Sequence, residues 1–109
     1  MDYSKKILPK LVDNSLNTIN PSEDILLPNY DGYSLVNIPS TICHLLDVPC
    51  FGASALAPEL LSLLEGPYKK VVLLVVDALG FNLMNDLMEK GYANLWKFAL
   101  EKSIYFPLT

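Results

Sequence analysis

The strongest constraint on the fold is a run of six aliphatic residues at positions 71–76, four of them valine. Lys69 and Lys70 precede the run, Asp77 ends it, and Gly80 follows. An uninterrupted run rich in β-branched residues is typical of a strand buried on both faces of a parallel sheet. In open α/β sheets, ligands bind just past the carboxyl ends of such strands. The pattern therefore places Asp77 where a ligand would bind.

The order of elements after this run favours an α/β fold. A helix is predicted over residues 81–90 and another from Asn94, followed by a second strand over residues 103–108. This β–α–α–β order is typical of the right-handed crossovers that build parallel sheets. Because two strands cannot form a stable parallel sheet alone, we expect a truncated sheet with flanking helices, completed by a missing C-terminal part. Upstream, helices are predicted from Asn37 and from Ser54.

Composition narrows the possible functions. The net charge is −4 and the chain contains no arginine, which argues against nucleic acid as a partner. The aliphatic run is too short to span a membrane, which takes about 20 residues, and the apolar stretch near the N-terminus is too short for a signal peptide. A cytoplasmic location is therefore expected. Cys43 and Cys50 are interpreted as reduced thiols, with a disulfide as the alternative, and His44 as a helix residue rather than a metal ligand.

The same residues carry a likeness to a known family. Residues 71–77 with Gly80, the following helix with Gly91, and the strand that ends at Thr109 resemble the opening of the alkaline phosphatase superfamily. The likeness is to the branch called type I phosphodiesterase/nucleotide pyrophosphatase, whose prokaryotic members have a similar lead-in to residues 27–40. It covers approximately residues 25–109.

This resemblance implies a metal-dependent hydrolase of phosphoesters or nucleotide phosphodiesters that uses two divalent ions, zinc or similar. Asp77 matches one metal ligand, whereas the serine or threonine nucleophile should fall just beyond Thr109 and the other ligands much later. The chain would then comprise an arm at residues 1–34 and, at residues 35–109, the incomplete N-terminal part of the hydrolytic α/β domain. Alone it is expected to be inactive and to bind no ion tightly. One departure is Ala78, where the family usually has glycine.

Several alternatives remain open at this stage. An alternative for Asp77 is a strand-end residue that caps the helix starting near Phe81. Thr109 is a weak candidate for the nucleophile, because it comes too early in the sequence. Asn82 and Asn85 could contact a phosphate, although solvated helix residues are the simpler interpretation. A different class of function is a non-catalytic α/β interaction module that docks on a partner protein. A dinucleotide-binding half-domain is disfavoured, because no G-x-G-x-x-G follows the run.

Overall fold

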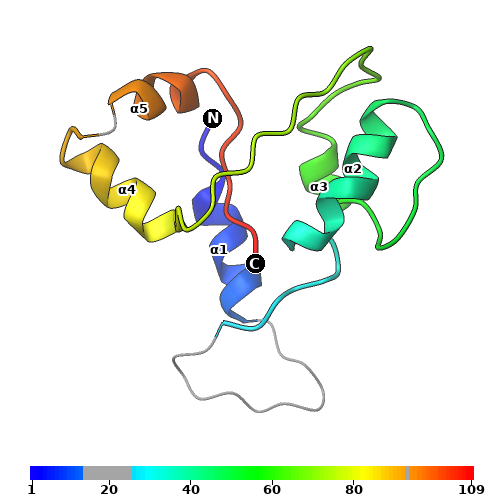
Figure 1. Ribbon diagram of the computed structural model, residues 1–109. Coiled ribbons are helices and arrows are strands. Elements are labelled where there is room, and N and C mark those ends of the chain that lie inside the picture. The colour runs from blue at the N-terminus through cyan, green and yellow to red at the C-terminus, as the bar shows by residue number, and fades with distance from the viewer. Residues whose placement is uncertain (14–25, 93) are drawn as a thin grey trace.

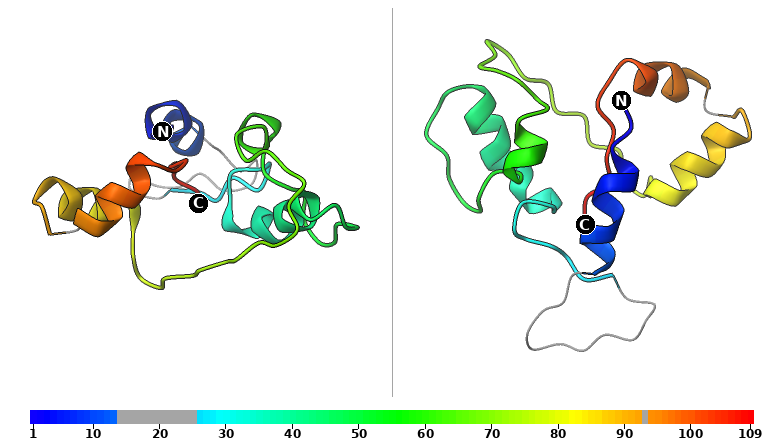
Figure 2. Two further views of the ribbon diagram at one scale, coloured as in Figure 1. Left: turned by 90° about the horizontal axis from the view of Figure 1, so that it is seen from above. Right: turned by 180° about the vertical axis from the view of Figure 1, so that it is seen from behind.

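The architecture consists of short helices joined by extended segments, and the computed structural model describes it for residues 1–13, 26–92 and 94–109. In chain order the helices are α1 (Ser4–Val12), the 3-10 turn η1 (Leu35–Asn37), α2 (Ile38–Leu45), α3 (Pro58–Leu61), α4 (Phe81–Glu89) and α5 (Asn94–Glu101). Figures 1 and 2 show α1 in the middle, with α2 and α3 on one side and α4 and α5 on the other. In these residue ranges, no helix is both long and apolar enough to cross a membrane.

The predicted α/β fold with the start of an alkaline-phosphatase-like parallel sheet is wrong. Across the described parts of the chain there is no strand and no sheet. Residues 71–76 are extended without a neighbouring strand. In the segment predicted as the second strand, Tyr105 forms an isolated parallel β-bridge with Asp2. The physical reason is that strand propensity reflects packing against cross-strand neighbours, which the described residues do not supply. A strand-like pattern therefore becomes only an extended connection.

Most of the predicted helices form, but one is shorter than expected. Helices α4 and α5 begin at Phe81 and Asn94, where the sequence places them. The helix predicted from Ser54 is reduced to the four residues of α3. Its start is delayed because a residue before proline is disfavoured in helical conformation, and Ala57 before Pro58 is extended with ψ 145°.

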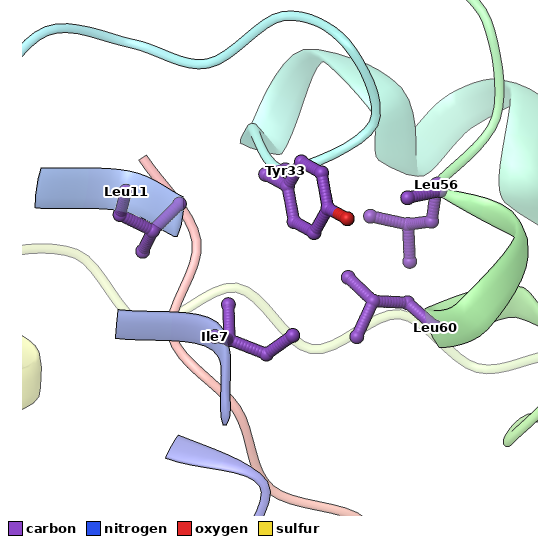
Figure 3. Packing of buried hydrophobic residues seen from close by; sticks show 6 residues of the cluster. Ile7, Leu11, Tyr33, Leu56 and Leu60 are labelled. Atoms are coloured by element: carbon purple, nitrogen blue, oxygen red, sulfur yellow. The ribbon is translucent and has the colours of Figure 1, made fainter. Parts of the chain in front are cut away.

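The hydrophobic core joins the N-terminal helix to the middle of the chain (Figure 3). Its buried members are Ile7, Leu11, Tyr33, Leu56, Ala57 and Leu60. Ile7 and Leu11 lie one helical turn apart on α1, so they present a single apolar face. That face packs toward Tyr33, Leu56 and Leu60, which come from the 33–60 part of the chain. This small cluster holds α1 against α3.

A close backbone approach beside the core requires glycine at position 32. Gly32 has φ +98°, a left-handed conformation that side chains disfavour, and its carbonyl accepts a 3.0 Å hydrogen bond from the Ala57 amide. A Cβ at this position would lie 2.3 Å from the Ala57 nitrogen. Any larger residue would therefore push the chain away from α3.

Buried polar side chains attach the loop after α2 to the helix itself. The Leu56 amide donates to Thr41 Oγ1 at 2.9 Å, and Thr41 Oγ1 donates to the Asn37 carbonyl at 2.7 Å. Ser40 Oγ donates to the Phe51 carbonyl at 2.7 Å. The side chains of Ser40 and Thr41 are both buried, so these bonds satisfy groups that water does not reach.

Asn37 is the centre of this polar network and is fully buried. Its Nδ2 donates to the carbonyls of Tyr30, at 3.1 Å, and Ser54, at 2.9 Å. Its Oδ1 accepts from the Ser34 amide at 3.0 Å. One side chain thus connects the turn before η1 to the loop that leads into α3. The sequence predicted an N-cap here; Asn37 does precede α2, but it makes no side-chain cap to that helix.

Candidate functional site

Asp77 lies at the end of the extended run, just before α4, and its side chain is exposed. Its Oδ1 accepts a 2.8 Å hydrogen bond from the adjacent Ala78 amide. No other hydrogen bond or ion pair to the carboxylate is found among the described residues. The second carboxylate oxygen is therefore accessible to a ligand from solvent.

The residue after Asp77 has an unusual backbone conformation. Ala78 has φ +57°, in the left-handed region that favours glycine. This is the position at which the phosphodiesterase family usually has glycine. Gly80 has φ −68°, and a Cβ there would meet nothing within 4 Å. The strain of the turn is thus carried by Ala78.

The other metal-binding residue types are scattered. Among the residues that the structure describes, no group of three His, Cys, Asp or Glu side chains is close enough to hold an ion. Cys43 is buried and Cys50 exposed, both as free thiols, and His44 is exposed on α2. Asp77 is therefore one carboxylate without a second protein ligand in the described ranges.

Thr109 is held by the backbone of the segment before η1. Its Oγ1 accepts from the Asn29 amide at 2.8 Å and donates to the Tyr33 carbonyl at 3.2 Å. Its backbone groups bond to Tyr33 and Leu35, both at 2.9 Å. With the hydroxyl engaged in this way, Thr109 serves to dock the end of the chain rather than to present a nucleophile.

The two asparagines of α4 differ in their surroundings. Asn85 Oδ1 accepts a 3.1 Å hydrogen bond from the Tyr105 hydroxyl, which ties α4 to the segment after α5. Burial raises the pKa of Tyr105, and the negative charge of Asp2 adds to this effect. Asn82 is exposed. Neither residue is placed beside Asp77 by a contact.

An apolar groove of about 640 Å³ lies along the extended run, and the sequence did not predict it. The groove is lined by the start of α2, by residues 73–76 of the run, by the start of α4, and by residues 105–108. Of these, residues 73–76 and 105–108 were predicted to belong to strands of a sheet. The apolar side chains of these residues were visible in the sequence. They form an open groove because no neighbouring strand covers them in the described parts of the chain.

A second polar cluster links α1 to α3. Lys10 Nζ donates to the Tyr33 hydroxyl at 2.8 Å and forms an ion pair with Glu59, and the Tyr33 hydroxyl also bonds to Glu59. The Lys10 ammonium, followed by the Tyr33 hydroxyl, lowers the pKa of Glu59 from 4.5 to about 2. Burial, followed by the bond to Glu59, raises the pKa of Tyr33. The cluster covers the edge of the core and serves stability.

We expect the Glu59 cluster to make stability fall in acid. Because the pKa of Glu59 is depressed in the folded chain, its contribution is present above about 4.5 and is lost as the pH falls toward 2. Glu59→Gln should remove much of the loss of stability over this pH window. Urea midpoints at pH 6 and pH 2.5 measure it, with exposed Glu101→Gln on α5 as the control. Equal acid losses in the wild type and Glu59→Gln would contradict the assignment.

Comparison with known proteins found no relative of this chain. No family model, no curated protein sequence and no solved structure matches the chain. The likeness to phosphodiesterases therefore rests on the residues of the sequence itself.

Proposed function

We propose that the chain is the N-terminal part of a metal-dependent phosphodiesterase or nucleotide pyrophosphatase. The observation that supports this most is the turn at residues 77 and 78. An accessible carboxylate ends the aliphatic run, and the residue after it has the left-handed backbone that suits the glycine usual in that family. The proposal concerns this ligand turn and does not need a sheet within the described residues.

In this proposal Asp77 is one ligand of a site for two divalent ions, with zinc as the leading candidate. The accessible oxygen of its carboxylate fits that role, while the other oxygen stays bonded to the Ala78 amide and fixes the orientation. The ions would polarise the phosphoryl group of a nucleotide or phosphodiester substrate and favour ionisation of the attacking hydroxyl. The further ligands and the nucleophile would be supplied by a C-terminal part, so these 109 residues alone would be inactive.

Substitution of Asp77 tests the proposal. The test uses the longer protein that is encoded if the reading frame continues after codon 109. Asp77→Asn keeps an oxygen for the Ala78 amide but removes the charge, and should lower both metal content and hydrolysis of a chromogenic phosphodiester. The expected loss is on the order of several kcal/mol of transition-state stabilisation. In the 109-residue chain, calorimetric zinc titration should give the same weak signal for wild type and variant, because one carboxylate builds no site.

The same variant separates metal binding from a capping role. If Asp77 only caps the turn, Asp77→Asn should behave as wild type while Asp77→Ala loses stability, because only alanine leaves the Ala78 amide without its partner. Unchanged metal content and activity in Asp77→Asn would contradict the proposal. A stop codon directly after codon 109 would contradict it as well.

A second candidate is a non-catalytic module that binds a protein partner. The observation that favours it is the exposure of the run, in which Val72 is 84% and Val75 76% exposed. Large apolar surfaces in solution usually mark interaction sites. This candidate needs neither an ion nor a nucleophile, so zinc titration and phosphodiester hydrolysis distinguish it from the first.

A further inference from the structure

The extended run has side chains that lack a cover. Val72, Leu74 and Val75 are 84%, 74% and 76% exposed, although they are among the most apolar residues of the chain. The groove described above touches the run along residues 73–76 but leaves these side chains open to solvent. An aliphatic surface of this kind is stabilised when it leaves water.

The backbone of the run also lacks partners. The amide and carbonyl groups of residues 71–76 form no hydrogen bond with any part of the chain that the structure describes. An extended segment with free amide and carbonyl groups is a template for pairing with another extended chain. The occupant that fits this template must therefore be extended and apolar, and it must match the charges at the two ends of the run.

We infer that the occupant is a second copy of this chain, paired with the run in antiparallel orientation. The charges decide the orientation. Lys69 and Lys70 lie at one end of the stretch, and Asp77 lies at the other. Antiparallel pairing brings each lysine end beside the aspartate end of the partner copy. Parallel pairing in register would instead put lysines beside lysines and Asp77 beside its own copy.

Symmetry then selects the register. A two-fold axis through an antiparallel pair places one residue opposite its own copy, and the midpoint of residues 69–77 is Leu73. With Leu73 opposite Leu73, Lys69 lies opposite Asp77 twice and Val71 lies opposite Val75. Centring the pair on Leu74 would move Asp77 opposite Val71 and remove both ion pairs. The inference concerns the chain on its own and does not rest on the proposed hydrolytic function.

Charge reversal and charge exchange test the pairing by sedimentation velocity over a concentration series. Lys69→Asp places two carboxylates opposite each other at both ends and should raise the dimer dissociation constant about tenfold or more. The exchange variant Lys69→Asp with Asp77→Lys restores the opposite charges and should regain the wild-type constant. Lys6→Asp makes the same change of net charge at an exposed site on α1 and should leave dimerisation unchanged.

Cysteine crosslinking tests the register in a Cys50→Ser background, which removes the exposed native thiol. Leu73→Cys should form a disulfide-linked dimer under mild oxidation, because directly opposite residues lie within disulfide range. Leu74→Cys should crosslink far more slowly, since its copy is a diagonal neighbour roughly 7–8 Å away. A monomer at all concentrations, or failure of the exchange variant to restore dimerisation, would overturn the inference. Equal crosslinking at both positions would do so as well.

Discussion

Asn37→Asp is expected to destabilise the folded chain by about 3–5 kcal/mol, a large share of the stability of a small domain. The substitution changes one atom of a fully buried side chain and leaves its shape intact. It replaces the donor that faces the carbonyls of Tyr30 and Ser54 with an acceptor. Two carbonyl oxygens would then face a buried carboxylate without a proton between them. The bond from the Ser34 amide would survive, because it is made to the oxygen that both side chains share.

Urea unfolding at pH 7 measures this loss directly. Asn82→Asp on α4 is the matched control, because it introduces the same charge at an exposed asparagine and should shift the midpoint very little. Asn37→Ala should lose about 3 kcal/mol, since it leaves the same backbone groups without partners but adds no charge. A midpoint for Asn37→Asp equal to that of Asn82→Asp would mean that Asn37 is not the buried link described here.

The helices were predictable because their signals are local. Gly80 immediately precedes the periodic apolar segment that becomes α4, and Asn94 begins the segment that becomes α5. The sequence therefore predicted both helix starts correctly. Sheet formation depends instead on a partner strand distant in the sequence, and no local pattern reveals whether one is present. The run at residues 71–76 has the residue types of a buried strand, yet it lies extended and exposed. The prediction failed at the pairing of the strand and not at its conformation.

The location of Asp77 was predictable, whereas its role as a metal ligand stays a prediction. The position of Asp77 at the end of an extended segment follows from the pattern, and an exposed carboxylate is found there. The left-handed conformation of Ala78 could not be predicted, because alanine normally avoids it. The role of Asn37 was also missed. An asparagine before a helix is typical of an N-cap, whereas the Asn37 side chain donates to the carbonyls of Tyr30 and Ser54, and Ser54 comes close only when the chain folds.

The largest expected difference in local stability lies between the exposed run and the buried helix α1, and amide hydrogen exchange measures it. In a dilute solution, the amide hydrogens of residues 71–76 should exchange with solvent almost as fast as those of an unfolded peptide, because they have no partner in the described parts of the chain. The amide of Leu11, within the buried turn of α1, should exchange at least about a thousandfold more slowly if it requires global unfolding. Concentrating the sample should selectively protect alternate amides of the run, since an antiparallel second copy bonds every second residue.

Hydrogen exchange of residues 71–76 at two protein concentrations, read residue by residue by NMR, tests the central claim that this strand-like run has no partner within its own chain. Fast exchange of all six amides at the lower concentration, and slower exchange of alternate amides at the higher one, are the expected results. Strong protection that is equal at both concentrations and matches that of Leu11 would contradict the account, because the run would then be paired inside the monomer.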